Sequence, residues 1–232
     1  MRYTQTYLLT AGELHMAAAA SGRRGLLMFG SEEKIDRAQQ IQSLIRMMNE
    51  GFLIRENGAL RVGAPLAPLL EVFRRSTHAV VAQKADCATT PVCIYPGGQD
   101  FLCIAPHRYR AGLYEVGLHE PDDLINSLEA RGLLPTALLC PDLNAEEFAG
   151  GIRGKLEILD RQWSDHMVRD AFADELLSTF ERYRLSDQAS VDKLLILKAP
   201  LAWCSAVRSV CPAEPTPYSH SAAAAWLKGA SQ

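Results

Sequence analysis

The residues of this chain with the most potential for chemistry are its cysteines and histidines, six of each. Cys103, His107 and His119 are close enough in the sequence to meet around one hairpin, and thiolate and imidazole are ligands that zinc prefers. Their spacing matches no standard zinc pattern, and the sequence offers no evident fourth ligand. We therefore expect no bound metal at these residues, which we interpret as ordinary strand and loop side chains.

A cysteine or serine nucleophile would need a recognisable setting, with a histidine base beside a catalytic thiol. The cysteines are dispersed through apolar runs and none forms a C-x-x-C pair, and no serine lies in a G-x-S-x-G motif. A hydrolase or redox enzyme would have to use Cys87 or Cys103. We expect instead that the cysteines are small buried residues in a reducing cytosol, and that a disulfide between Cys93 and Cys103 is absent.

The sequence also gives little support for a phosphate-binding loop or for catalysis by a pair of carboxylates. Gly97-Gly98 lacks the lysine and the helix that follow the glycines of a phosphate-binding loop. Asp122/Asp123 and Glu146/Glu147 each fall in the first turn of an expected helix, where the helix dipole favours acidic side chains. We predict no catalytic residue and no cofactor, and therefore that the protein is not an enzyme.

Composition indicates a folded protein without a strong electrostatic preference. The chain has 232 residues, of which 48% are hydrophobic, and a formal net charge of −3. An apolar content of about half is enough for a hydrophobic core. The small net charge gives no general electrostatic attraction to nucleic acid or anionic lipid. No apolar run approaches the roughly 20 residues that span a bilayer, and the N-terminus does not look like a signal peptide. We expect a cytosolic protein.

The first part of the chain predicts helices followed by a hairpin. Thr10 and Glu13 form a capping box that begins a helix running to about Ala20. Ser31 caps a second helix, which ends at Gly51. Apolar residues recur along this second helix at helical spacing, at Ile35, Ala38, Ile41, Ile45 and Met48.

The segment "GFLIRENGALRVG" then predicts a tight hairpin, with strands near 52–55 and 59–62 joined by Asn57-Gly58. We expect its apolar residues to bury the stripe of the second helix; these are Leu53, Ile54, Leu60 and Val62. A short helix from Pro65 to about Phe73 follows.

From His78 onward the pattern changes to strands. "HAVVAQK", "PVCIYP", "DFLCIAP" and "AGLYEVGLH" are short, rich in β-branched residues and separated by turns, which predicts an antiparallel meander. Pro121 begins a helix that ends near Gly132, and Asn144 with Glu147 indicates another helix start. We predict a strand in "GKLEILDRQ", a helix over "SDHMVRDAFADELLSTFERYRL" whose last residues would also suit a strand, and strands in "DKLLILKAP" and "AWCSAVRSV". The tail "YSHSAAAAWLKG" fits either a helix or an edge strand.

These elements define the α+β class, with a twisted, mainly antiparallel sheet flanked by helices. We divide the chain into a helical, winged-helix-like subdomain over residues 1–76 and a sheet with flanking helices over residues 77–232, and we expect the two to form one compact body. "SLIRMMNEGFLI" and "SLEARGLLP", about 84 positions apart, share a helix-to-strand junction. This internal echo suits a fold built from two halves related by a pseudo-twofold axis.

A winged helix raises the alternative of a transcription regulator with a C-terminal sensing domain. The second helix carries polar residues that could read bases, Gln39, Gln40, Gln42, Arg46 and Asn49, and the wing carries Arg55 and Arg61. Residues 1–75, however, contain ten Lys and Arg and seven Asp and Glu, so the excess of positive charge is small. Glu56 lies at the wing tip, where phosphate would bind. Because phosphate contacts dominate affinity for DNA, nucleic acid is the less favoured partner.

The order of motifs resembles the EspG-like family of type VII (ESX) secretion over about residues 7–135. The matching positions are Leu9-Thr10 with Glu13, Ser43-Leu44 with Gly51-Phe52-Leu53, and Leu66 with Leu69-Leu70. The resemblance implies a non-enzymatic cytosolic adaptor or chaperone with an antiparallel sheet, whose partner is a protein, such as a small helical secreted protein. No specific contact residue carries over from the resemblance, and the oligomeric state stays open. We expect no membrane association, because no apolar run is long enough to span a bilayer.

Overall fold

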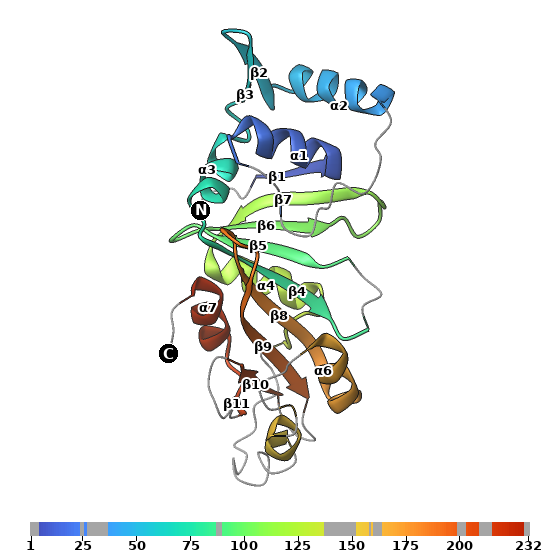
Figure 1. Cartoon of the computed structure of the whole chain (residues 1–232), viewed down its shortest axis with the longest axis vertical. Helices are drawn as coiled ribbons and strands as arrows, with labels where there is room; N and C mark the ends of the chain where they lie inside the picture. The colour runs from blue at the N-terminus through green and yellow to red at the C-terminus, as the bar shows by residue number, and fades with distance from the viewer. Residues whose placement is uncertain are drawn as a thin grey trace. The chain divides into compact units, whose positions relative to one another are not determined.

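The computed structural model confirms the α+β class. The residues that it describes are 5–23, 26, 37–86, 90–136, 152–157, 159, 164–198, 203–208 and 215–229. They divide into two compact units, each assembled from two segments of chain. The first unit comprises Met1–Ala79 and Val92–Glu120, and the second comprises Val80–Pro91 and Pro121–Gln232. Each unit has an antiparallel sheet accompanied by helices (Figure 1).

The first unit begins with a strand and two helices, followed by a hairpin and a third helix. Three strands of the predicted meander complete it. Its elements are β1 (Thr6–Thr10), α1 (Ala11–Ala20), α2 (Arg37–Asn49), β2 (Leu53–Glu56), β3 (Ala59–Val62), α3 (Ala67–Arg75), β5 (Val92–Pro96), β6 (Phe101–Pro106) and β7 (Leu113–His119). Its sheet has the order β1-β7-β6-β5, and β2 and β3 form a separate two-stranded ribbon. The predicted meander is confirmed, because β5, β6 and β7 pair antiparallel in sequence.

The core of the first unit lies between α3 and strands β5 and β6. Phe73 of α3 meets Tyr95 of β5 edge to face, with ring centroids 5.1 Å apart. Arg23 donates hydrogen bonds to the carbonyl oxygens of Phe73 and Ser76, and its guanidinium lies over the Phe73 ring. These contacts satisfy carbonyl groups at the end of α3 that the helix itself leaves without donors.

The capping box at the start of α1 forms as predicted. The Thr10 hydroxyl accepts a hydrogen bond from the Glu13 amide at 3.2 Å, and the Glu13 carboxylate accepts one from the Thr10 amide at 2.8 Å. The predicted start of the second helix at Ser31 lies outside the described residues, where α2 is described from Arg37.

The predicted hairpin also forms, with Asn57 and Gly58 both at positive φ, as a two-residue type I′ turn requires.

The two similar segments noted in the sequence, "SLIRMMNEGFLI" and "SLEARGLLP", end their helices in the same way. In α2 the Phe52 amide donates to the Met47 carbonyl and Gly51 has φ +71°; in α4 the Leu133 amide donates to the Leu128 carbonyl and Gly132 has φ +69°. Both are glycine caps of the Schellman type. The relation of two whole halves stays a prediction.

The second unit contains most of β4 and the C-terminal elements. These are β4 (His78–Lys84), α4 (Pro121–Ala130), α6 (Asp165–Ala171), β8 (Leu176–Arg184), β9 (Ser190–Lys198), β10 (Trp203–Val207), β11 (Thr216–Pro217) and α7 (His220–Lys228). The strands follow the order β4-β8-β9-β10-β11, in which β8 pairs antiparallel with β9, β9 with β10 and β10 with β11. In the ambiguous tail α7 is a helix, capped by the Ser219 hydroxyl and ended by Gly229 at φ +81°.

One prediction for this unit was wrong, and a second was right for only part of its length. "GKLEILDRQ" was predicted as a strand, but the described residues 152–157 and 159 are helical. Ile152, Leu156 and Leu159 are buried at helical spacing against Val168 and Phe172. The buried side chains recur at the spacing of a helix. The short alternation of apolar and polar residues that indicated a strand was therefore misleading.

The long predicted helix over residues 164–185 is only half helical. It ends at Ala171, and β8 follows from Leu176, in the part that would also suit a strand. Leu176, Ser178 and Phe180 alternate into the interior, and β8 pairs with β9 along its length. Tertiary pairing therefore overrides the helical spacing of the apolar residues.

The helix α7 is tied to β8 and β9 by a buried polar cluster. Asp192 accepts hydrogen bonds from the Trp226 indole at 3.0 Å and from Arg182 at 3.2 Å. The Arg182 guanidinium lies 4.3 Å from the centre of the Trp226 ring and also donates to the Trp226 carbonyl. Burial lowers the pKa of Arg182, and the charge of Asp192 opposes that change. At the start of α7, His220 contacts Glu129 at 2.9 Å.

The two compact units differ from the predicted division at residue 76. Strands β5, β6 and β7 belong with the N-terminal segment, because β1 pairs along its whole length with β7. The predicted division followed chain order, whereas strand pairing joins segments that are about a hundred residues apart. As an independent description of folding domains, the division at 76 stays a prediction.

Candidate functional site

The side chains considered for metal binding do not converge. Among the described residues, no group of three or more His, Cys, Asp or Glu side chains has an arrangement that could hold a metal ion, and this includes Cys103, His107 and His119. His107 has a local role instead, since its Nδ1 accepts hydrogen bonds from the Tyr109 and Arg110 amides at 3.1 Å each. These bonds stabilise the turn between β6 and β7.

Cys93 and Cys103 are buried thiols that are not joined in a disulfide. Cys93 lies opposite Ile104 and Cys103 lies opposite Ile94, so the two cysteines are one position out of register. Burial raises the pKa of Cys93, and the neighbouring Cys103 adds to the rise. A thiol that resists ionisation is a poor nucleophile at neutral pH. Cys87 lies outside the described residues.

We expect both thiols to be protected from alkylation in the native protein. Iodoacetamide at pH 7 should label Cys93 and Cys103 slowly in buffer and fully in 8 M urea, because each is at most 3% exposed and the reaction needs an accessible thiolate. Peptide mass mapping of matched native and unfolded samples measures the difference. Rapid labelling of either cysteine in the native protein would contradict this expectation and would support an enzyme with a reactive thiol.

Of the paired acids, Asp122 and Asp123 lie in the first turn of α4, as predicted for residues that stabilise a helix start. Glu146 and Glu147 lie outside the described residues. Another acid, Glu13, is only 1% exposed. Its carboxylate accepts hydrogen bonds from Arg46 at 3.1 Å, and Arg46 also donates to the Leu8 carbonyl at 3.0 Å. A single arginine therefore anchors α2 to β1 and α1.

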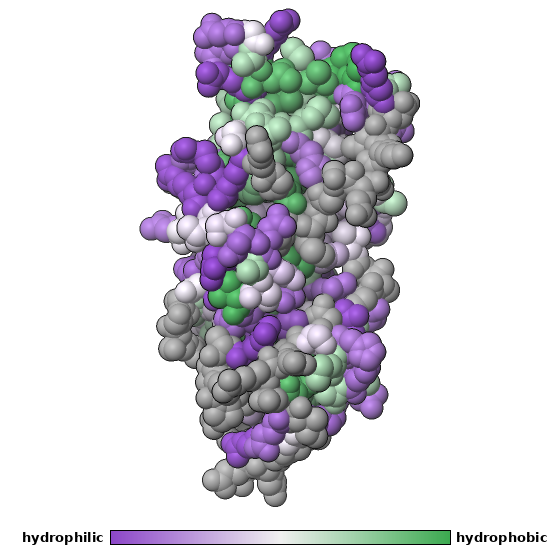
Figure 2. All heavy atoms as spheres, in the orientation of Figure 1, coloured by the Kyte–Doolittle hydropathy of each residue, from purple (hydrophilic) through white to green (hydrophobic). Residues whose placement is uncertain are grey.

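The orientation of α2 that results differs from our prediction. Met47 is fully buried, and Ser43 and Leu44 are partly covered. Of the predicted core stripe, Ile35 lies outside the described residues and Ala38 is exposed. The other three residues also face solvent: Ile41 is 50%, Ile45 53% and Met48 41% exposed. We name these three residues the α2 stripe. Figure 2 shows apolar surface gathered over α2, beside the hydrophilic tip of the hairpin.

The hairpin does not cover the α2 stripe as predicted. Leu53 is buried, but Ile54 and Leu60 are 45% and 42% exposed. The register pairs Leu53 with Val62 and Ile54 with Arg61, so the side chains of Ile54 and Leu60 lie on opposite faces of the ribbon. A two-stranded ribbon can bury only one of its faces against α2. The sequence did not reveal this exposed apolar surface, because its residues were assigned to the core.

Two of the four arginines on α2 and the hairpin, Arg46 and Arg61, are paired with carboxylates. Arg46 is held by Glu13 and Glu50, and the hydrogen bond to Glu50 is the largest cause of its raised pKa. Arg61 pairs with Glu56 at 2.9 Å on the exposed hairpin. Arginines already paired with carboxylates have less to offer phosphate groups. The pairing of Arg46 and Arg61 therefore lowers the positive charge that α2 and its hairpin can offer to phosphate.

Comparisons with known proteins give a distant similarity at the level of structure. No protein-family model and no curated protein sequence matches the chain. Among solved structures, the chain is similar to the Mycobacterium tuberculosis type VII secretion system chaperone EspG5, solved in complex with the PE25–PPE41 dimer. The alignment covers 97% of this chain and 95% of that chain, with 10% identity and a TM-score of 0.47. This is a distant structural relationship, and membership of the EspG-like family stays a prediction.

No helix among the described residues is both long enough and apolar enough to cross a membrane.

Proposed function

We propose that this protein is a non-enzymatic adaptor or chaperone that binds a helical segment of another protein along the α2 stripe. The observation that carries the proposal is the exposure of Ile41, Ile45 and Met48 on a helix that is firmly anchored by Glu13 and Arg46. Their spacing of i, i+4 and i+7 forms one ridge, the arrangement that packs against the groove of another helix.

The energy available from the stripe sets the size of the partner surface. Full burial of a large apolar side chain contributes about 1.5–3 kcal/mol, and these three are already roughly half covered. Covering what remains would contribute on the order of 2–4 kcal/mol, well short of the roughly 8 kcal/mol of micromolar binding. Binding of that strength would need the partner to bury surface well beyond the stripe, and the exposed hairpin side chains Ile54 and Leu60 offer part of it.

A finer proposal follows from the sequence motifs that resemble the EspG-like family. We propose that the partner is a small helical type VII secretion substrate, which the protein keeps soluble in the cytosol before export. An apolar helix that is bound along the stripe would be shielded from aggregation, which is the physical task of such a chaperone.

We expect Ile45→Asp to weaken partner binding at least tenfold while leaving the fold intact. The aspartate would place a charge in the centre of the apolar contact, yet Ile45 is more than half exposed in the free protein. The partner is first identified by photo-crosslinking from position 41 in native cells, and its affinity is then measured with purified proteins by calorimetry. Val191→Asp is the matched control, because Val191 is 47% exposed on β9 of the other unit.

Three outcomes would contradict the proposal. Equal affinity of the wild type and Ile45→Asp would remove the stripe from the interface. Concentration-dependent dimerisation, abolished by Ile45→Asp in sedimentation experiments, would assign the stripe to a second copy of this chain. A gel shift with duplex DNA that falls steeply with salt would favour the transcription regulator instead.

A further inference from the structure

The turn between β6 and β7 presents an aromatic ring between two arginines. Its outermost residues are Arg108, Tyr109 and Arg110, and all three are exposed. We name these three residues the arginine–tyrosine tip. Tyr109 is 89% exposed, more than any other large hydrophobic side chain among the described residues. A single exposed apolar residue is ordinary, so its charged neighbours and the rigidity of the turn are what distinguish this one.

Hydrogen bonds within the turn fix the backbone of the tip. The Nδ1 atom of His107 accepts hydrogen bonds from the Tyr109 and Arg110 amides at 3.1 Å each, and the His107 amide donates to the Leu113 carbonyl at 2.8 Å. The rings of His107 and Tyr109 meet edge to face, with centroids 6.1 Å apart. A turn that is already ordered loses less conformational entropy when a partner binds.

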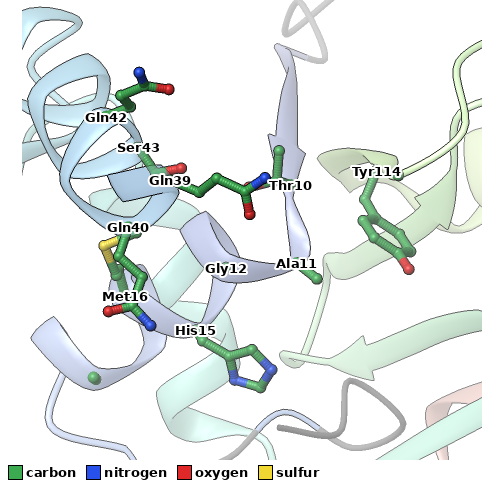
Figure 3. Close-up of a pocket in the computed structure, with 12 residues that line it drawn as sticks. Thr10, Ala11, Gly12, His15, Met16, Gln39, Gln40, Gln42, Ser43 and Tyr114 are labelled. Carbon is green, nitrogen blue, oxygen red and sulfur yellow. The ribbon is translucent and has the colours of Figure 1, made fainter. Parts of the chain in front are cut away.

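The base of the turn faces the body of the first unit, whereas the tip is open. Gly112 and Tyr114 line a pocket together with residues of α1 and α2, and Figure 3 shows Tyr114 on the β7 side of this pocket. The three residues of the arginine–tyrosine tip do not line it. Their exposure leaves them accessible to the surface of a large partner.

The two arginines of the tip are available for a negatively charged partner. In the part of the chain that the structure describes, neither Arg108 nor Arg110 pairs with an acidic side chain. The sequence contains no Asp or Glu between Asp100 and Glu115. A guanidinium group without a partner can form charge-assisted, bidentate hydrogen bonds with a carboxylate. Charge complementarity therefore points to an acidic partner.

We propose that the arginine–tyrosine tip binds an acidic segment of another protein, in which carboxylates on both sides of an apolar side chain meet Arg108 and Arg110. Tyr109 packs on that apolar side chain, and tyrosine and arginine are among the residues that dominate binding energy at interfaces. Single-stranded nucleic acid also combines stacking with negative charge, but it is held along a positively charged groove. The tip offers two arginines on a chain of net charge −3, which favours a short acidic segment. The site shares no residue with the α2 stripe and does not depend on the proposed function.

The test uses the immobilised full chain and three pools of synthetic nonapeptides, N-acetylated and C-amidated. Each pool has a central leucine or phenylalanine, flanked on both sides by Asp or Glu in the acidic pool, Asn or Gln in the amide pool, and Lys or Arg in the basic pool. Mass spectrometry identifies the retained peptides, and fluorescence anisotropy measures the affinity of the best one. We expect retention of the acidic pool alone, with an affinity that falls between about 50 and about 300 mM salt, because salt screens exposed charges.

Variants of the tip assign the binding to its side chains. Arg108→Ala/Arg110→Ala should weaken binding of the best acidic peptide at least tenfold, because hydrogen bonds between charged groups are among the stronger ones. Tyr109→Ala should weaken it about tenfold, whereas Tyr109→Phe keeps the ring and should bind like the wild type. Arg108→Glu/Arg110→Glu should reverse the selection, so that the basic pool is retained instead.

Arg74→Ala/Arg75→Ala is the matched control and removes the same charge. Both arginines are exposed on α3 but pair with Glu71, at 2.9 Å and 2.6 Å, so this variant should bind the acidic peptide like the wild type. Circular dichroism checks that every variant is folded.

Four results would overturn the inference. The first is that no pool is retained above a column without protein, and the second is that the amide pool is retained as well as the acidic pool. The third is an equal loss of affinity in Arg74→Ala/Arg75→Ala and Arg108→Ala/Arg110→Ala, which would indicate a general effect of charge. The fourth is tighter binding of an oligothymidylate than of the best peptide, lost in Tyr109→Ala, which would assign the tip to nucleic acid.

Discussion

Replacing Gly63 with alanine is expected to lower the free energy of unfolding by about 3 kcal/mol or more, at the upper end of the usual overpacking range. A Cβ atom at this position would lie 1.8 Å from the Gly51 carbonyl oxygen, 2.8 Å from the Gly51 carbonyl carbon and 3.2 Å from the Phe52 carbonyl carbon. All three are backbone atoms, so no side-chain rotation relieves the overlap. The end of β3 passes directly over the C-terminal cap of α2, and only glycine permits that approach.

The surrounding backbone has little freedom to move away. Gly51 is held at φ +71° by the helix cap, and the Gly63 amide donates to the Phe52 carbonyl at 2.8 Å. Urea unfolding followed by circular dichroism measures the loss of stability. Because the clash separates α2 from the hairpin, we also expect Gly63→Ala to lose binding of the proposed partner.

Gly154→Ala provides the matched control. Gly154 lies within the helical residues 152–157, and a Cβ atom there would meet nothing within 4 Å. Alanine in an open helical position should stabilise the protein by about 0.5–1 kcal/mol. The same chemical change is thus expected to have opposite signs at the two glycines. An unchanged urea midpoint in Gly63→Ala would show that the close approach of β3 to the cap of α2 is not present in solution.

Asp192→Ala is expected to lower the free energy of unfolding by about 3–5 kcal/mol, the usual effect of removing one partner of a buried ion pair. The substitution leaves Arg182 without its counter-charge, where the two side chains are only 12% and 6% exposed. It also removes the acceptor of the Trp226 indole N–H, a buried hydrogen bond of 3.0 Å. Both losses fall on the contact between α7 and strands β8 and β9.

The local consequence should be release of α7 before the rest of the second unit unfolds. Hydrogen exchange measured by mass spectrometry should show faster exchange of the amides of residues 220–228 in Asp192→Ala. Asp192→Asn keeps an acceptor for the indole and should lose less stability. Asp187→Ala removes a carboxylate that pairs with Arg184 at the exposed turn between β8 and β9, and should change stability little. Equal protection of α7 in the wild type and Asp192→Ala would exclude the cluster as its anchor.

The elements predicted correctly from the sequence are those with a local cause. The capping box of Thr10 and Glu13, the Asn57-Gly58 turn and the glycine after α4 each act on residues within a few positions of themselves. Strands β5 to β7 were predicted because their apolar residues are short runs bounded by turn residues. The errors over residues 152–157 and 159 and at β8 occurred where local spacing suited more than one structure.

The sequence by itself determined the α+β class, the helix caps and the hairpin, because these depend on backbone preferences and short-range hydrogen bonds. It also identified Ile41, Ile45 and Met48 as one side of a helix. Only the tertiary structure decided that this side faces solvent, because burial depends on what lies across from a helix. The ion pair between Glu13 and Arg46, 33 residues apart, sets that orientation.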